Sequence, residues 1–339
     1  MKRKVILGVV CAMLSWAWLE TPVIWAQAKP IELTYSIFFP APHKNTVLAT
    51  QWAEEINKRT NGRVKITMFP GGTLTPADKC YDGVVKGLSD IGMSVVSYTR
   101  GRFPLTEVID LPLGYKNGLA ATKLVNAYYK KFKPKEFEDT KVMYLHAHGP
   151  GILHTKKPVQ KLEDLKGMKI RSTGTVAKIV AALGATPVAM PMPETYDALQ
   201  KGIAEGVMCP VEALEGWKLG EVIKSTTLNY GSAYTIAFFV VMNKERWNSL
   251  PPDIQKIIEQ VNEEWIEKTG KSWDEIDTSG MQFTKKLGNQ VIQLSKEEDE
   301  RWVKAVKPVF DDYVKAMKEK GLPGEEALKF CLEELKKLQ

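Results

Sequence analysis

Hydrophobic and polar positions in the N-terminal part of the chain repeat with two different periods. Ile31 to Ser36 and Val64 to Phe69 have the alternation of β-strands, and Asp90 to Val96 has the continuous apolar character of a buried strand. Between them, Thr46 to Lys58 and Pro76 to Gly87 have helical spacing. Strands that alternate with helices predict an α/β class with largely parallel sheets.

The pattern then predicts a passage into a second unit of the same kind. Val142 to His154 is extended and long enough to cross from one unit to the other. A short strand ends at Ile170, and a helix is expected from about Gly174, with Ser172 and Thr173 as N-caps. Two further strand–helix pairs follow, with strands at Pro187 to Ala189 and Val207 to Cys209 and helices from Glu194 and Glu212.

The chain is predicted to return through the apolar run Thr235 to Asn243, because that run reads as a buried strand. Two crossings between units are what a hinge requires. Pro251 and Pro252 begin a very long helical pattern that persists to about Leu287. The tail from Lys296 to Gln339 has the pattern of two amphipathic helices with a break near Gly321 to Gly324.

The N-terminus has the composition of a secretory signal. Lys2 to Lys4 are basic, Val5 to Trp18 is apolar, and Ala26-Gln27-Ala28 matches a cleavage site, so the mature chain is expected to begin near Lys29. The alternative is an uncleaved membrane anchor, which the shortness of the apolar run disfavours. The expected location is therefore the periplasm.

Charge and cysteine content narrow the class of protein. The formal net charge is +7, but basic and acidic residues are interspersed, so no patch of the kind that binds nucleic acid is formed. Cys80, Cys209 and Cys331 remain after cleavage, and an odd number implies at least one free thiol. No nucleophile elbow, phosphate-binding glycine loop or helical metalloprotease motif is present, which disfavours an enzyme.

The stretch Gly167 to Val207 carries the most informative chemistry. It places Arg171 at the end of a strand and next to the start of a helix. A guanidinium beside free helix N–H groups is a natural receptor for a carboxylate. The residues with motif-like spacing are Gly167, Lys169, Ile170, Arg171, Gly184, Ala185, Pro187, Pro193, Glu194, Tyr196, Ala198, Leu199, Gln200, Gly202, Glu205 and Gly206.

This ordered series, with Thr60 to Leu74 and Leu250 to Ile258, resembles the solute-binding proteins of tripartite ATP-independent periplasmic (TRAP) transporters over nearly the whole mature chain. The resemblance implies a two-lobed, Venus-flytrap α/β fold with a long helix that spans both lobes. It also implies integral-membrane permease subunits as partners. The expected segments are a signal peptide at 1–28, lobe I at 29–148, lobe II at 149–236, the return to lobe I and interlobe helix at 237–285, and C-terminal helices that pack on the lobes at 286–339.

Two departures from the family pattern bear on the ligand. Some relatives carry a second arginine where this chain has His148 to Leu153, and many carry an asparagine where it has Cys209. Both changes remove polar contacts that sugar-acid binders use, which puts a sialic-acid-like or dicarboxylate ligand in doubt. Apolar and aromatic residues take their place, so a small monocarboxylate with a hydrophobic or aromatic body is expected, with Arg171 on its carboxylate.

The predicted ligand-binding residues are Arg171, Phe39, His43, Ser97, Tyr98, Met190, Cys209, Glu212, Trp217 and Tyr234. His43 either faces the ligand or caps a helix, and Glu212 either holds a ligand hydroxyl, orients Arg171 or serves as a first-turn carboxylate. His146, His148 and His154 lack a carboxylate or cysteine at ligand spacing, so no metal and no cofactor is predicted. The remaining functional alternatives are a ligand-binding subunit of a sensory system and a secreted enzyme that acts on a small acid.

Overall fold

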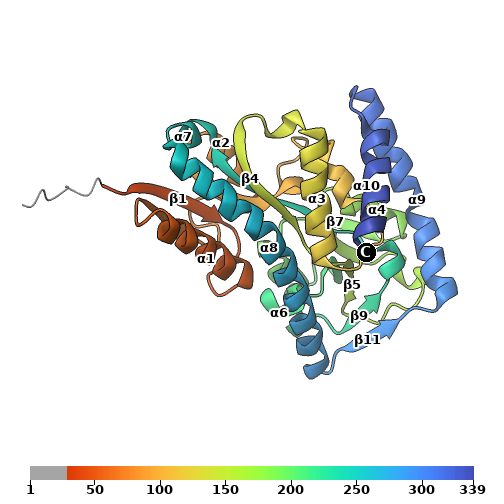
Figure 1. The fold of residues 1–339 in the computed structure, drawn as a ribbon. Helices are drawn as coiled ribbons and strands as arrows, with labels where there is room; N and C mark the ends of the chain where they lie inside the picture. The colour runs from red at the N-terminus through yellow and green to blue at the C-terminus, as the bar shows by residue number, and fades with distance from the viewer. Residues whose placement is uncertain (1–28) are drawn as a thin grey trace, which may run out of the picture.

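A computed structural model describes residues 29–339, and the expected signal peptide lies outside these described residues. The fold has two β-sheets, which the chain visits alternately (Figure 1). The first sheet has the order β2-β1-β3-β10-β4. Its strands are β1 (Ile31–Ile37), β2 (Val64–Phe69), β3 (Ile91–Val95), β4 (Thr140–Ala147) and β10 (Ala237–Asn243).

In the first sheet β1 is parallel to β2 and β3, and β10 is antiparallel to its neighbours β3 and β4. The second sheet has the order β11-β9-β5-β8-β6-β7, with β5 antiparallel to β8 and β9. Its strands are β5 (Gly151–Thr155), β6 (Lys169–Ser172), β7 (Thr186–Ala189), β8 (Gly206–Pro210), β9 (Ser225–Leu228) and β11 (Gln290–Gln293). The predicted α/β class with two sheet-based lobes is confirmed.

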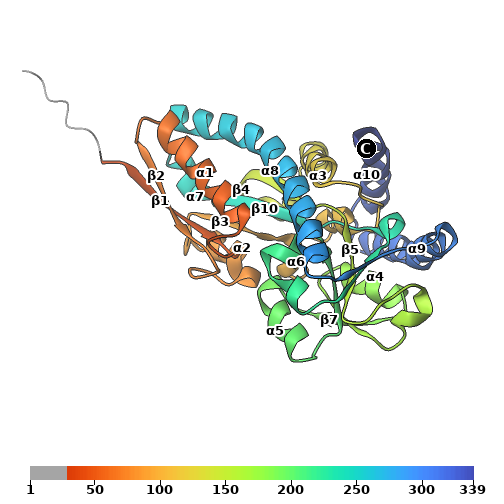
Figure 2. The same ribbon diagram turned by 90° about the horizontal axis from the view of Figure 1, so that it is seen from below.

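Helices cover both sheets. Those beside the first sheet are α1 (Lys44–Arg59), α2 (Cys80–Val85), α3 (Gly118–Phe132) and α7 (Lys244–Asn248), and those beside the second are α4 (Val176–Ala182), α5 (Thr195–Gln200) and α6 (Ala213–Gly216). The C-terminal helices are α9 (Lys296–Glu319), which packs on α4, and α10 (Gly324–Leu338), which packs on α3. Both views place α9 and α10 on the side of the molecule away from β1 (Figure 2).

The long predicted helix is α8 (Pro252–Lys286), and it contacts both halves of the molecule. It packs on α1, α3 and β4 of the first half and on α6 of the second. Two glycines allow close approach: a Cβ on Gly270 would lie 2.9 Å from the Cα of Leu119, and one on Gly280 would lie 2.5 Å from the carbonyl oxygen of Val211. In Figure 2, α8 runs from the neighbourhood of α7 to that of α6.

The chain crosses between the sheets three times. The run expected to be continuous from Val142 to His154 is two strands in different sheets, separated at 148–150. The second crossing lies between β9 and β10, as the apolar run from Thr235 indicated. The third was not predicted: after α8, β11 pairs with β9 in parallel register and so returns the chain to the second sheet.

The local prediction for the start of α4 was wrong. Ser172 is the last residue of β6, and the N-cap of α4 is Thr175, whose side chain makes no capping hydrogen bond. Arg171 therefore lies within β6 rather than beyond its end. The chain needs the intervening residues to turn, and Gly174 takes a left-handed conformation there with φ of 50°.

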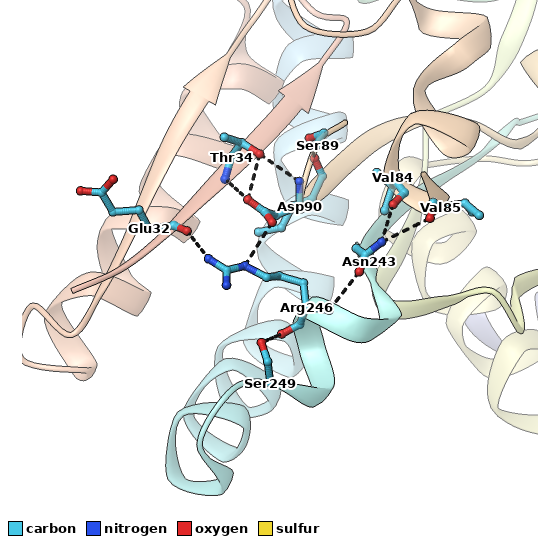
Figure 3. A network of polar contacts seen from close by, with 10 residues as sticks. Glu32, Thr34, Val84, Val85, Ser89, Asp90, Asn243, Arg246 and Ser249 are labelled. Atoms are coloured by element: carbon cyan, nitrogen blue, oxygen red, sulfur yellow. Dashed lines mark hydrogen bonds and ion pairs between the residues drawn. The ribbon is translucent and has the colours of Figure 1, made fainter. Parts of the chain in front are cut away.

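A polar network connects strands at the end of the first sheet where β3 begins and β10 ends (Figure 3). Asp90 accepts hydrogen bonds from the backbone N–H and the hydroxyl of Thr34, at 2.7 and 2.9 Å. Arg246 lies 3.2 Å from the second oxygen of Asp90 and donates to the carbonyl of Glu32 at 2.6 Å. Asn243 caps α7 by accepting from the N–H of Arg246. Asp90 and Arg246 thus have partners that fix strand positions.

Candidate functional site

At the other end of its strands, the first sheet meets the second sheet around a small, partly open cavity of about 30 Å³. That volume is comparable to the volume that one water molecule occupies in liquid water, so the two halves lie close against each other here. The lining side chains come from both sheets and from α8: Phe38, Phe39, Val95, Tyr98, His148, Arg171, Met192, Cys209, Pro210, Glu212, Trp217, Tyr234, Ile236, Phe238 and Trp273.

Seven of the ten predicted site residues line this cavity, namely Phe39, Tyr98, Arg171, Cys209, Glu212, Trp217 and Tyr234. The other three lie close to it. His43 contacts Glu212, while Ser97 and Met190 line a separate surface hollow. Met190 contributes its backbone carbonyl to Arg171, and Met192 supplies the methionine side chain of the cavity.

Arg171 is 2% exposed and has only neutral acceptors. Its Nε and Nη2 donate to the carbonyl oxygen of Met190 at 3.1 and 2.8 Å, and Nη2 also reaches the Tyr98 hydroxyl at 3.4 Å. Within residues 29–339 no carboxylate lies within the 4.0 Å of an ion pair with it. A guanidinium keeps its charge under all ordinary conditions, and an uncompensated buried charge is costly. The charge of Arg171 therefore has no counter-ion among the described residues.

Aromatic rings form the rest of the cavity wall. Phe38 stacks on Phe39 with ring centroids 4.3 Å apart, and it lies nearly parallel to Trp217 at 6.0 Å and to Phe238 at 6.4 Å. Trp273 of α8 packs on Phe238 at 5.4 Å. Flat apolar walls beside a cationic group suit a flat organic anion, because the rings provide dispersion contact while the cation fixes orientation.

Glu212 and His43 form a buried pair that joins the two halves. His43 Nδ1 accepts from the N–H of Asn45 at the start of α1, so Nε2 carries the proton and donates to Glu212 Oε1 at 2.6 Å. His43 therefore caps a helix, as one of its two interpretations held. The pair leaves no room for a side chain at position 216, since a Cβ on Gly216 would lie 2.3 Å from Glu212 Oε1.

Asp277 of α8 was not predicted as a site residue. Its Oδ1 accepts a hydrogen bond of 2.8 Å from the backbone N–H of Glu212. Burial raises the pKa of Asp277 to about 8, and the neighbouring Glu212 and Asp274 carboxylates add to this rise. The helix thus contributes a polar anchor directly beneath the site as well as Trp273.

His154 and His146 each have hydrogen-bond partners within the chain. His154 Nδ1 lies 2.9 Å from the Thr226 hydroxyl and its Nε2 lies 3.2 Å from the Cys209 carbonyl. His146 accepts from the indole N–H of Trp273 at 3.0 Å and stacks on Phe238. No group of three or more potential metal ligands occurs among residues 29–339.

Cys80, Cys209 and Cys331 are all free and buried, and burial raises the pKa of each thiol. Cys209 therefore lines the cavity as a neutral, weakly polar side chain. None of the three cysteines among the described residues forms a disulfide.

A two-lobed α/β protein that closes a cationic, aromatic-walled cavity between its lobes is a solute-binding protein by architecture. The comparison with known families agrees. Residues 38–316 match the model of the bacterial extracellular solute-binding protein family 7, and the chain belongs to this family, which includes the TRAP solute-binding proteins.

Solved structures of TRAP solute-binding proteins resemble about nine-tenths of the chain. One from Desulfovibrio salexigens is 35% identical with a TM-score of 0.80, and the match covers 91% of this chain and 96% of that one. One from Rhodoferax ferrireducens, in complex with copurified benzoate, is 29% identical with a TM-score of 0.86 and coverage of 91% and 98%. One from Bordetella bronchiseptica, with bound (R)- and (S)-mandelate, is 31% identical with a TM-score of 0.85 and coverage of 91% and 100%.

These relatives are binding proteins rather than enzymes, and the family is one of periplasmic transport components that bind small organic acids and work with membrane permeases. Within the described part of the chain, no helix has both the length and the apolar character that crossing a membrane requires.

Proposed function

We propose that this protein binds a small monocarboxylate with a hydrophobic or aromatic body in the periplasm and delivers it to a TRAP permease. No covalent bond of the ligand changes in the process. The buried guanidinium of Arg171 without an acidic partner is the observation that carries this proposal. The aromatic wall formed by Phe38, Trp217 and Phe238 supports the aromatic body of the ligand.

The printed ligands of two similar structures support the same ligand class. Benzoate and mandelate, bound by the Rhodoferax and Bordetella proteins, are both aromatic monocarboxylates. Each would place one carboxylate on Arg171 and one ring between the aromatic side chains. A dicarboxylate would bring a second negative charge among apolar rings, where burial without a partner is unfavourable.

In this proposal the lobes are residues 29–148 together with 237–285, and residues 149–236. Arg171 belongs to the second lobe, whereas Phe38, Tyr98 and Phe238 belong to the first. A ligand therefore touches both lobes only when they are closed, and its binding shifts the open–closed equilibrium towards the closed form. The closed form is then the one that the permease receives.

Titration calorimetry with benzoate, mandelate and phenylacetate tests the proposal, with benzamide and succinate as the uncharged and dicarboxylate controls. We expect the aromatic acids to bind at least about a hundredfold more tightly than benzamide, because loss of a charged partner for a buried guanidinium costs about 3 kcal/mol or more. Mass analysis of the acid after incubation separates binding from turnover. Equal affinity for benzoate and benzamide would refute the proposed role of the cation.

A further inference from the structure

His148 lines the cavity but has no role in the carboxylate site described so far. It lies directly after β4, at the first crossing between the sheets. The imidazole is 2% exposed, and its Nε2 atom has no hydrogen-bond partner within residues 29–339. An unpartnered polar atom in so buried a position needs an explanation.

The hydrogen bond of Nδ1 determines which ring nitrogen of His148 carries the proton. Nδ1 lies 2.6 Å from the carbonyl oxygen of Gly149, and a carbonyl can only accept, so Nδ1 carries the proton. Burial lowers the pKa of His148 to about 4, against the opposing effect of the Gly149 bond, and the charge of Arg171 lowers it further. The imidazole is therefore neutral near pH 7, and Nε2 has a lone pair that can accept but no proton to donate.

The position of the ring is fixed from several sides. Tyr234, Phe238 and Trp273 meet the imidazole edge to face, with centroids 5.5, 6.2 and 6.0 Å away. The Thr235 hydroxyl donates to the His148 carbonyl at 2.6 Å and holds the backbone. Because Nδ1 is occupied by the Gly149 carbonyl, Nε2 is the ring nitrogen left for a molecule in the cavity that His148 lines.

The cavity thus has two complementary polar poles. Arg171 is a donor that requires an anion, and His148 Nε2 is an acceptor that requires a donor. The Glu212 carboxylate already accepts from His43, and the Tyr98 hydroxyl already accepts from the N–H of Met192 at 2.9 Å. A plain aromatic acid in its ionised form satisfies Arg171 but offers nothing to Nε2.

We propose that His148 Nε2 accepts a hydrogen bond from a hydroxyl group of the ligand, so that the protein selects hydroxylated aromatic monocarboxylates over their deoxy analogues. This inference rests on the proposed function, since it presupposes an acid bound at Arg171. The hydroxyl is either on the carbon next to the carboxylate or on the ring, and the two cases are separated by the probes used.

Calorimetric titration of the full mature protein with two pairs of acids tests this inference. Mandelate against phenylacetate probes a hydroxyl next to the carboxylate, and 3-hydroxybenzoate against benzoate probes a ring hydroxyl. We expect one pair to show a preference of about ten- to a hundredfold for the hydroxylated member, the range expected when a buried acceptor is left unpaired.

Two variants assign the preference to His148. In His148→Phe an aromatic ring is kept and the acceptor is lost, so the preference for the hydroxylated acid is expected to fall to within about twofold. In His148→Gln an acceptor oxygen is restored, and part of the preference should return. The comparison within each pair of acids cancels changes in overall affinity that a repacked ring would cause.

The outcomes separate the two proposals. If the wild-type protein binds none of the four acids, the proposed function fails and this inference fails with it. If it binds both members of each pair equally, or if His148→Phe keeps the full preference, only the role of His148 is overturned. If His148→Phe does not fold, the wild-type pairs and His148→Gln still decide the question.

Discussion

Two arginines, Arg246 at one end of the first sheet and Arg171 on β6 of the second sheet, show how differently the same side chain is used. Arg246 has a 40% exposed side chain, pairs with Asp90 and donates to the Glu32 carbonyl (Figure 3). Arg171 is 2% exposed and has only a carbonyl and a phenol as partners. The first arrangement is complete within the chain. The second leaves the charge without an acidic partner, and this difference is the basis for our proposal that Arg171 binds the ligand.

Replacing Arg171 by Met tests the comparison most strongly. We expect affinity for an aromatic acid to fall by two to four orders of magnitude, because a desolvated ion pair with one partner removed loses about 3–5 kcal/mol. The unliganded variant should unfold at no lower temperature than the wild type, since an uncompensated buried charge is lost. Calorimetric titration and thermal unfolding measure the two effects. Lys169→Met, an exposed change on the same strand, is the control and should alter neither.

The buried pair of His43 and Glu212 should give the second-largest effect, on stability. His43→Leu leaves the Glu212 carboxylate buried without its donor, which is expected to lower the free energy of unfolding by about 3 kcal/mol. Urea unfolding measures it. Lys44→Met changes the next residue, whose side chain is 51% exposed, and should cost less than about 0.5 kcal/mol. A loss below about 1 kcal/mol in His43→Leu would mean that the pair is solvated.

Asp277 should make stability depend on pH. Its pKa is about 8 in the folded protein and near 3.8 when unfolded, so the folded state holds a proton that the unfolded state releases between these values. The contribution of this proton to the free energy of unfolding is complete below about pH 4 and is lost as the pH rises through 8. Asp277→Asn removes the titrating group and should reduce this decline in the free energy of unfolding by about 1–2 kcal/mol between pH 5 and pH 8. The effect is limited to this size because the Asp277 side chain is only half-buried.

Urea unfolding at several pH values checks this expectation. Glu275→Gln, on the exposed face of the same helix, is the matched control and should leave the slope unchanged. An identical pH profile in Asp277→Asn and in the wild type would show that another group titrates.

The smallest effect is expected at Arg246, where the charges are already matched and accessible to solvent. Arg246→Met should lower the free energy of unfolding by about 1 kcal/mol and leave ligand affinity within twofold of the wild type. Unfolding and titration of one sample measure both. A large loss of affinity would contradict the proposal that Arg246 has a structural role whereas Arg171 binds the ligand.

Elements with a strong local signal could be predicted from the sequence. The strand Val64–Phe69 has the predicted bounds, and α8 was placed to within about a residue at each end because its proline entry and its apolar spacing are both explicit. β9 and β11 were missed, since four-residue strands show no measurable period. α3 was not predicted, although its buried Ala121, Leu124, Val125 and Tyr128 follow helical spacing.

The site could be predicted in part, for a physical reason. Arg171, Cys209 and Glu212 lie at strand ends or just after them, positions that local sequence reveals. Trp273 and His148 reach the cavity because of how α8 and the first crossing segment pass between the sheets. The sequence drew attention to His146 and His148 only as possible metal ligands, because the partners that decide their chemistry, Trp273 and Gly149, depend on the fold.

The glycine contacts of α8 constrain how the molecule can move. Gly270 holds the helix against α3, and Gly280 holds it against the residue that follows β8. In the proposed opening motion, both contacts can persist only if the stretch 271–279, about 13 Å of continuous helix, bends. An α-helix resists bending because its hydrogen bonds must lengthen on one side. We therefore expect α8 to oppose opening elastically, whether or not a solute is bound.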